Sequence, residues 1–389
     1  MQPGIASARG ADDGLPRVSI LMTGAGGGHL ASARSLEEAF EGRARVTLVN
    51  VLDEHSPFPF DHISDSYASV VAIAPGLYRL AYNVVQTPAG LRLLENGAYA
   101  MLRKEMAKAI IDTRPDVVIS VHGLLNDVPL RAIRQAGCSA PFVSVVVDSG
   151  VPPVSWFTSR ADLCCVPDEG IRRMAIDAGM PPERVLVTGL PIRRAFVEAR
   201  GLDETGARQA LGLDPDLPLV LVMGGGAGMG RVGSMTAAVA KRLAGSGVRA
   251  QIAVIAGNND RLRARLTRVD WPVPVTVLGF TQDVALWMAA ADVLLTKAGS
   301  GAIAEAACIG VATLLTGFVP GQEEGNIAWA RESGAAVFEP RPKRAAALVE
   351  RWLGPDRGEL EDLAARMRAA GRPEASRAIA DAVLALLPD

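Results

Sequence analysis

The chain has 389 residues, of which 49% are hydrophobic and 21% are charged. This balance is typical of a globular protein, and the length predicts two domains, each large enough for its own core. A formal net charge of −2 and a pI near 6.2 argue against nucleic acid as a partner.

The cysteines, Cys138, Cys164, Cys165 and Cys308, show neither metal-ligand spacing nor a disulfide framework, which favours a reducing cytosol. Residues 1–15 are small and polar, so we expect a disordered leader and not a signal peptide. No stretch of the sequence reaches the ~18 uncharged apolar residues that a membrane-spanning helix needs. We therefore expect a cytoplasmic protein whose membrane contact, if it has any, is peripheral.

The N-terminal region predicts an opening βαβ unit. Residues 18–22 read as a strand, 30–41 as a helix and 46–51 as a second strand, with a glycine loop ending at Gly28 and His29 between the first two. Ligands of doubly wound domains bind at the carboxyl ends of strands. His29 is therefore a candidate catalytic residue, and a capping or packing histidine is the alternative.

A helix is predicted over residues 91–111. It carries Arg92, Arg103, Lys104 and Lys108 beside several leucines and methionines. Such a helix can meet anionic lipid, or it can be an ordinary helix with one face on the core and one in solvent. Both interpretations stay open.

Two polar residues follow the next predicted strands. A strand predicted at 116–121 is followed by His122, and one predicted at 142–147 is followed by Asp148. Both therefore fall in the crevice at the carboxyl edge of the sheet. Strands at 163–166 and 185–188 complete a first domain that we place at residues 16–200.

The second domain, predicted at residues 201–370, repeats the alternation of strand and helix. A strand at 219–223 precedes the glycine loop 224–230, a strand at 250–255 precedes Gly257 and Asn259, and a strand at 275–278 precedes Phe280 and Thr281. Residues 360–387 look helical, and we expect residues 371–389 to pack back on the first domain.

The most informative stretch joins a strand at 291–295 to a helix at 302–308 through Thr296, Lys297 and a Gly-Ser-Gly turn. Backbone N–H groups and the positive end of the helix dipole make an anion site at such a turn, and Lys297 adds a full charge. Glu305, one turn into the helix, can accept hydrogen bonds from sugar hydroxyls. Gln322 and Glu323, in a second loop, offer an amide and a carboxylate. A site for phosphate next to groups that bind sugar hydroxyls predicts a nucleotide-sugar as the ligand. The alternative is an ordinary turn between strand and helix, with Glu305 in solvent.

The fold class that follows is α/β, with two doubly wound units facing each other across a cleft. A cleft of this kind suits a reaction that needs two substrates and little water.

At this point the motifs resemble a known family. They are TGAGGGHLASA at 23–33, VISVHGLLNDVPL at 118–130, residues 147–156, GLPIR at 189–193, VMGGGAGMG at 222–230, LGFT at 278–281, TKAGSGAIAEA at 296–306 and GQEEGN at 321–326. In this order they are similar to the GT-B-fold glycosyltransferases that include monogalactosyldiacylglycerol synthase and the processive diacylglycerol glucosyltransferases. A more distant similarity is to the peptidoglycan N-acetylglucosaminyltransferase that makes lipid II.

The resemblance implies an inverting hexosyltransferase of GT-B fold with two Rossmann-like domains. It would move galactose or glucose from a UDP-sugar, its co-substrate, to a hydroxyl of a membrane lipid such as diacylglycerol. It would need no tightly bound cofactor or metal. The expected location is the cytoplasm, with peripheral contact at the inner face of the cell membrane.

The resemblance also implies roles for individual residues. His29 would be the base or would orient the acceptor, and Asp148 would orient or polarise it. Gly28, His122 and Trp156 would lie on the acceptor side. Phe280 would hold the uracil, Glu305 the ribose hydroxyls, and Gln322 and Glu323 the transferred sugar. The diphosphate would be lined by Gly225, Gly226, Met229, Ser300 and Gly301. The remaining donor-side residues would be Gly257, Asn259, Thr281, Thr296, Lys297, Gly299 and Asn326.

Four departures from the family pattern bear on the acceptor more than on the donor. Leu30 replaces a basic residue, Pro152 and Pro153 fill a space that often holds a histidine, and Asp127 and Ala227 replace a histidine and an acidic residue. Three alternatives therefore remain: a glycosyltransferase with a soluble acceptor, a non-catalytic nucleotide-sugar sensor, and a UDP-sugar 2-epimerase. The last would need more carboxylates and histidines converging on the sugar than the sequence offers.

Overall fold

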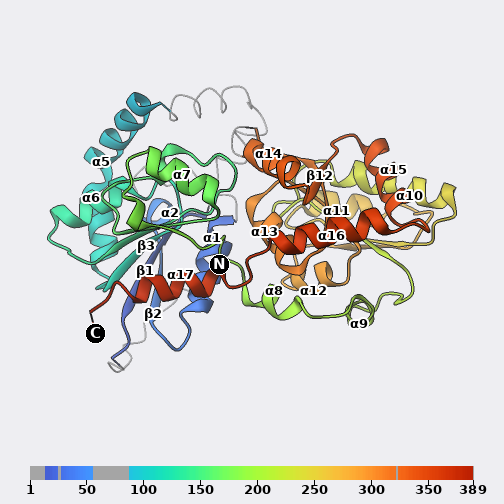
Figure 1. The fold of residues 1–389 in the computed structure, drawn as a ribbon, viewed down its shortest axis with the longest axis horizontal. Coiled ribbons are helices and arrows are strands. Elements are labelled where there is room, and N and C mark those ends of the chain that lie inside the picture. The colour runs from blue at the N-terminus through green and yellow to red at the C-terminus, as the bar shows by residue number, and fades with distance from the viewer. Residues whose placement is uncertain (1–13, 25–27, 56–86, 321–322, 389) are drawn as a thin grey trace.

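A computed structural model describes residues 14–24, 28–55, 87–320 and 323–388 of the chain. Within these ranges the backbone forms two six-stranded parallel sheets with helices around them, side by side along the longest axis of the molecule (Figure 1). The predicted α/β class with two doubly wound units is confirmed. The expected leader, residues 1–15, lies outside the described residues apart from Gly14 and Leu15. In the described part of the chain, no helix is both long and apolar enough to cross a bilayer.

The first sheet has the strand order β2-β1-β3-β4-β5-β6. Its strands are β1 (Arg17–Met22), β2 (Arg45–Asn50), β3 (Val117–Ser120), β4 (Phe142–Val145), β5 (Leu163–Val166) and β6 (Val185–Val187). The order reverses between β1 and β3, and in doubly wound sheets a crevice opens at such a switch point. The loops that follow these two strands, which lead to His29 and His122, therefore meet there.

The second sheet has the strand order β12-β11-β10-β7-β8-β9. Its strands are β7 (Leu219–Met223), β8 (Gln251–Ile255), β9 (Val275–Leu278), β10 (Val293–Lys297), β11 (Ala312–Gly317) and β12 (Ala336–Phe338). Here the order reverses between β7 and β10. The switch point consequently brings the glycine loop after β7 beside the turn after β10, which are the two anion-binding segments that the sequence predicts.

Helices cover both sheets. Those that pack on the first sheet and precede the second are α1 (Gly28–Ala39), α2 (Val51–His55), α5 (Pro88–Ile111), α6 (Asp127–Gln135) and α7 (Glu169–Asp177). The second half contains α8 (Arg194–Ala199), α9 (Glu204–Ala210), α10 (Val232–Ser246), α11 (Asp260–Thr267), α12 (Val284–Ala289), α13 (Ser300–Ile309), α14 (Glu324–Ser333), α15 (Pro342–Trp352) and α16 (Gly358–Ala370). Short 3₁₀ turns lie at Val154–Trp156 and Pro182–Arg184.

The last helix, α17 (Ala375–Leu384), returns to the first half, where Figure 1 shows it beside α1 and β2. Its residues Ile379, Ala380 and Val383 are wholly buried in the first core. Arg43 Nη2 lies 2.6 Å from Asp381 Oδ1 and ties the helix to the turn between α1 and β2. The helical stretch expected over residues 360–387 is thus two helices, and Pro373, which lacks a backbone N–H, falls in the break between them.

We propose that each sheet marks a domain, at residues 16–200 and 201–370 as the sequence predicts, with residues 371–389 returning to the first. Helix α8 lies within the first of these ranges but packs on α12 and α13 of the second half. The chain therefore passes between the halves twice, once before α8 and once before α17.

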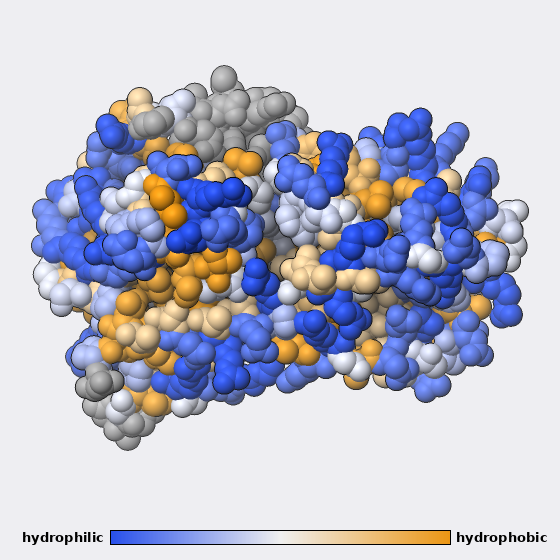
Figure 2. Space-filling view, in the orientation of Figure 1, coloured by the Kyte–Doolittle hydropathy of each residue, from blue (hydrophilic) through white to orange (hydrophobic). Residues whose placement is uncertain are grey.

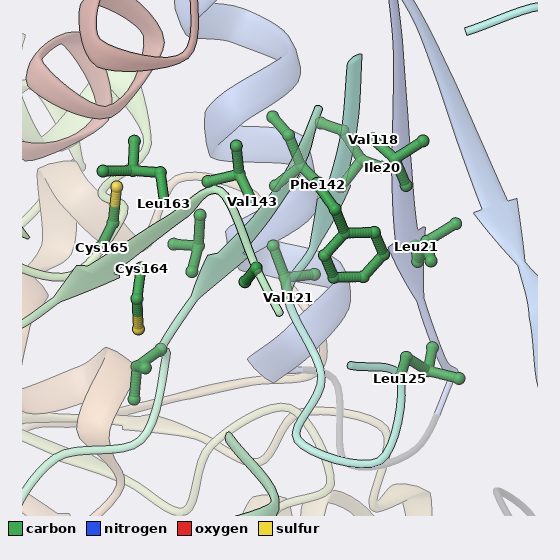
Figure 3. Close-up of a cluster of buried hydrophobic side chains, with 14 of the residues drawn as sticks. Ile20, Leu21, Val118, Val121, Leu125, Phe142, Val143, Leu163, Cys164 and Cys165 are labelled. Atoms are coloured by element: carbon green, nitrogen blue, oxygen red, sulfur yellow. The ribbon is translucent and has the colours of Figure 1, made fainter. Parts of the chain in front are cut away.

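The core of the first half holds the site in place. Figure 3 shows Phe142 from β4 beside Leu21 and Val121, in a cluster of buried, mostly aliphatic side chains that also includes Cys164 and Cys165. Full burial of one such side chain contributes about 1.5–3 kcal/mol. Because Val121 is anchored in this cluster, the position of its backbone carbonyl at the edge of the site is fixed.

Candidate active site

His29 is the second residue of α1 and follows the carboxyl end of β1. Its Nδ1 lies 2.8 Å from the carbonyl oxygen of Val121. A carbonyl oxygen can only accept, so Nδ1 carries the hydrogen, and in the neutral ring Nε2 keeps its lone pair. The local structure therefore presents the Nε2 atom of His29 as a proton acceptor.

His122 stands against His29, with ring centroids 4.3 Å apart and planes tilted by 57°. The backbone N–H of Leu124 donates to His122 Nδ1 at 3.2 Å. Burial and the neighbouring His29 hold the pKa of His122 well below its ordinary value, so this ring is neutral at pH 7. His29 therefore stands against an uncharged neighbour.

Trp156 links Asp148 to this pair. The indole Nε1 donates to Asp148 Oδ2 at 2.8 Å, and the Trp156 ring centroid is 6.4 Å from that of His29. Trp156 is wholly buried, and a Cβ on Gly123 would lie 3.1 Å from its Nε1. The fold thus gathers His29, His122, Asp148 and Trp156 at one edge of the first sheet, with Gly28 exposed at the start of α1.

Lys297, at the end of β10, is paired with Glu323 across the turn. The other carboxylate oxygen of Glu323 accepts from the Val319 N–H at 2.8 Å, and Glu323 is only 7% exposed. A Cβ on Gly299 would lie 2.9 Å from Lys297 Nζ, so glycine lets the lysine fold over the turn. The charge of Lys297 is therefore balanced locally. Gln322, predicted beside Glu323, lies outside the described residues.

Glu305, one turn into α13, is paired with Arg193. Arg193 Nη2 and Nε both donate to Glu305 Oε1, at 2.8 and 3.3 Å. Burial raises the pKa of Glu305, and the Arg193 charge opposes that rise. Arg193 is not among the site residues that the sequence predicts. Its presence in the GLPIR motif was the available signal, but a partner 112 positions away cannot be read from spacing.

The glycine loop after β7 packs backbone to backbone on the loop after β8. Gly257 has φ +58°, and a Cβ there would lie 2.3 Å from the Gly226 oxygen. The Asn258 N–H donates to that same oxygen at 2.8 Å. Asn259 caps α11, because its Oδ1 accepts from the Leu262 N–H at 2.9 Å. Gly257 and Asn259 thus shape the loop that carries the half-buried Gly225 and Met229.

Ser300 and Gly301 open α13, a helix of 10 residues whose free N–H groups face the turn. Asn326 on α14 donates through Nδ2 to the Ala298 carbonyl at 2.7 Å and to Ser300 Oγ at 3.2 Å. Thr296 is fully buried, and its Oγ1 has no hydrogen-bond partner among the described residues. These groups meet at the switch point of the second sheet.

Two predicted donor residues stand apart from this group. Phe280 is 63% exposed, and the Oγ1 of Thr281 accepts from the Asp283 N–H at 3.1 Å. Both follow β9, which β7 and β8 separate from β10. Across the described ranges, no group of three or more His, Cys, Asp or Glu is placed to hold a metal ion.

The two halves meet beside these residues. The Ser149 N–H, next to Asp148, donates to Ser300 Oγ at 3.1 Å. Figure 2 shows the surface indented where the halves join. One side of the junction therefore presents the imidazole of His29, and the other presents a helix N-terminus and the paired carboxylates Glu305 and Glu323.

Comparisons with known proteins agree with this geometry. A sequence model of monogalactosyldiacylglycerol (MGDG) synthase matches residues 29–192, and the glycosyltransferase family 28 C-terminal domain matches residues 219–325. The chain is 34% identical over 373 residues to chloroplastic monogalactosyldiacylglycerol synthase of Spinacia oleracea, covering 92% of this chain and 70% of that protein. It is 35% identical over 390 residues to a probable monogalactosyldiacylglycerol synthase 2 of Oryza sativa subsp. indica, covering 95% and 82%.

The fold comparison points the same way. MurG of Acinetobacter baumannii superposes with a TM-score of 0.60 at 15% identity, covering 95% of this chain and 100% of that one. At such identity the likeness shows the fold alone, and it confirms the predicted GT-B arrangement. The sequence matches go further: this chain belongs to the monogalactosyldiacylglycerol synthase family.

Proposed function

We propose that the chain is an inverting hexosyltransferase that moves galactose or glucose from a UDP-sugar to a hydroxyl of diacylglycerol. Family membership supports this activity. The observation that carries the chemistry is the hydrogen bond from His29 Nδ1 to the Val121 carbonyl. It orients the ring and leaves Nε2 as a base at the junction of the two halves.

In the proposed reaction, His29 Nε2 removes the proton of the lipid hydroxyl while its oxygen attacks the anomeric carbon. The bond from that carbon to the diphosphate oxygen breaks on the opposite face, so the configuration inverts. UDP leaves with the bonding electron pair. Asp148, held by Trp156, orients the acceptor, with Gly28 and His122 around it.

The leaving diphosphate gains charge as its bond breaks, and the N-terminus of α13 is placed to stabilise it. We propose that Ser300, Gly301, Gly225, Gly226 and Met229 line this group. Glu323 neutralises the charge of Lys297, so Lys297 contributes less to stabilising the diphosphate than an unpaired lysine would. The helix dipole and the backbone N–H groups therefore supply most of this stabilisation.

The carboxylates of the second half are proposed as sugar-binding groups. Glu305 would accept from the ribose hydroxyls, and Glu323, with Gln322, from the transferred hexose. Each carboxylate has about four lone-pair sites, so a pairing with Arg193 or Lys297 leaves acceptor capacity. Phe280 would hold the uracil through its exposed ring. The remaining proposed donor-side residues are Gly257, Asn259, Thr281, Thr296, Gly299 and Asn326.

We further propose a peripheral contact between α5 and the inner face of the cell membrane, with the protein otherwise in the cytoplasm. On α5, Leu93 is 77% exposed and Met101 is 56% exposed. Arg92, Lys104 and Lys108 are exposed on the same helix. Apolar side chains flanked by cations favour anionic lipid.

Replacing Leu93 and Met101 together by serine should weaken flotation with anionic vesicles, because apolar area available for insertion is lost. Leu202→Ser, at a position 50% exposed outside α5, is the matched control. Equal flotation of the double variant and the control would remove α5 from the membrane contact.

The activity itself is tested by UDP release, measured over UDP-galactose, UDP-glucose and UDP-N-acetylglucosamine with and without diacylglycerol vesicles. We expect release with a UDP-hexose that depends on diacylglycerol. Release that depends only on a soluble alcohol would make the acceptor a soluble molecule. UDP-hexose binding without release under any condition would make the chain a sensor.

A further inference from the structure

The loop after β4 reaches across to the second half. Besides the hydrogen bond from the Ser149 N–H to Ser300 Oγ, Gly150 packs directly on Gly325 of α14. We call Ser149, Gly150, Ser300, Gly325 and Asn326 the glycine seam. It joins the segment that holds Asp148 to the N-terminal ends of α13 and α14.

Backbone atoms of Gly150 and Gly325 are in direct contact in the seam, with no side chain between them. A Cβ on Gly150 would lie 2.3 Å from the carbonyl carbon of Gly325, and a Cβ on Gly325 would lie 2.4 Å from the Val151 nitrogen. No rotamer change relieves a clash with backbone atoms. Gly150 also has φ +76°, which favours glycine in any arrangement of the halves. Gly325 has no such requirement, so only the contact demands a glycine there.

Polar groups in the seam are not all satisfied by the described residues. Ser300 Oγ accepts from both the Ser149 N–H and Asn326 Nδ2. Ser149 Oγ and Asn326 Oδ1 are buried, yet neither has a partner in the described part of the chain. A buried polar atom without a partner destabilises the folded protein. Both atoms are closed to solvent in this arrangement, so a ligand with donors and acceptors at the start of α13 would satisfy them once a small side-chain movement exposes them.

We propose that the glycine seam is the positioning contact of the transferase and that the donor completes it. Resting on the proposed function, this means that Ser149, Gly150 and Gly325 are positioning residues. Ser149 Oγ would donate to an oxygen of the UDP-sugar, and Asn326 Oδ1 would accept from one of its hydroxyls. The seam then fixes the position of Asp148, and through it that of Trp156, relative to the donor bound at α13.

The decisive variant is Gly325→Ala. Alanine favours a helix more than glycine does, so α14 should not be weakened, while the new Cβ prevents the seam from closing. A misplacement of about 1 Å can cost about 100-fold in rate. We expect kcat to fall about 10- to 100-fold, with the affinity for UDP alone changed less than about threefold.

Gly245→Ala on α10 is the matched control, because a Cβ there meets nothing within 4 Å. It should match the wild-type protein in kcat and in the radius of gyration from small-angle X-ray scattering. We expect Gly325→Ala to have the larger radius in the presence of UDP. This scattering comparison tests the seam even if no sugar transfer is found in the wild-type protein, which would count against the proposed function alone.

Ser149→Ala provides an independent variant that introduces no clash and keeps the backbone N–H. We expect its kcat to fall about 3- to 10-fold with an unchanged melting temperature, and Ser149→Thr, which retains a hydroxyl, to recover part of that loss. Wild-type turnover in both Gly325→Ala and Ser149→Ala, with wild-type scattering, would overturn the proposal.

Discussion

The hydrogen bond that His29 Nδ1 makes with the Val121 carbonyl determines which ring nitrogen can act. Replacing His29 by alanine removes the ring nitrogen, Nε2, that this hydrogen bond leaves with its lone pair. We expect kcat to fall about 100-fold or more, since general acid–base catalysis contributes about 10²–10⁴-fold. UDP binding should be unchanged, because the ring belongs to the acceptor side. Turnover and calorimetric UDP affinity measured on the same preparation check both parts.

Substitution of another histidine in the first half serves as the control. It distinguishes a role of His29 in the reaction from a general effect of removing an imidazole. His55, at the exposed end of α2, is the matched position. His55→Ala should turn over at the wild-type rate. If His29→Ala does so as well, His29 takes no part in the reaction.

Glu305 is the residue whose replacement should act on the donor. Glu305→Ala deletes the proposed ribose contact and leaves the Arg193 charge without its partner. A hydrogen bond to a charged group contributes about 1.5–3 kcal/mol, so we expect UDP affinity to fall about tenfold or more. Calorimetry measures it directly. Glu324→Ala, exposed at the start of α14, should bind UDP normally, and an equal affinity in the two variants would remove Glu305 from the donor site.

At the scale of elements, the packing of α5 on α6 contains a pH-sensitive carboxyl group. Burial, followed by the nearby Asp127 charge, raises the pKa of Glu95 from its ordinary 4.5 to about 7, against the lowering effects of Arg131, Arg160 and Arg92. Between these two values the native state binds more protons than the unfolded state. Its stability therefore falls as the pH rises from about 4.5 and levels off above about 7.

Glu95→Gln removes this titration, because glutamine resembles the protonated form at every pH. Since Glu95 is only half buried, we expect a gain in unfolding free energy of about 1 kcal/mol at pH 8 and almost none at pH 4.5. Urea unfolding at the two values measures it. Glu105→Gln, exposed on the same helix, should show no such difference. A gain of equal size at both pH values would mean that titration of Glu95 is not its cause.

Elements were more predictable from sequence than contacts. The strand at 219–223 and its glycine loop were expected because an apolar run ending in glycines is a local signal. The strand β10 begins and ends two residues later than the expected 291–295, at Val293 and Lys297, since pairing with β11 overrides the polarity of Thr296 and Lys297. Pro373 is a local signal for a helix break, but the sequence-based expectation of one helical stretch over 360–387 did not take it into account.

The same distinction holds for the candidate site: positions along the chain were predictable, and contacts between distant residues were not. The sequence placed His29 at the start of a helix, and the structure finds it there. It placed Glu305 near the start of a helix at 302–308, but α13 begins at Ser300, so Glu305 lies midway along it. The stacking of His29 on His122, and the pairing of Glu305 with Arg193, depend on strand order at the two switch points. Strand order is set by the packing of the whole sheet, so no short stretch of sequence carries it.

At the scale of the molecule, α17 couples the halves. It follows the second half in the sequence, yet Ile379 is wholly buried against the core under α1, the helix that begins at His29. A mutation at the far end of the chain should therefore loosen the element that carries the base. We expect Ile379→Ala to lower the free energy of unfolding by about 2–5 kcal/mol, because it leaves a cavity.

The conservative variant Ile379→Val should cost only about 0.5–1.5 kcal/mol, since it removes a single methyl group. Hydrogen exchange locates the effect: amides of α1 should lose protection in Ile379→Ala, while those of α10, which packs on α15 in the second half, keep theirs. Uniform loss of protection in both helices would mean that the halves unfold as one unit. Wild-type protection in α1 would mean that α17 does not hold that helix, and the halves would then be coupled through α8 and the glycine seam.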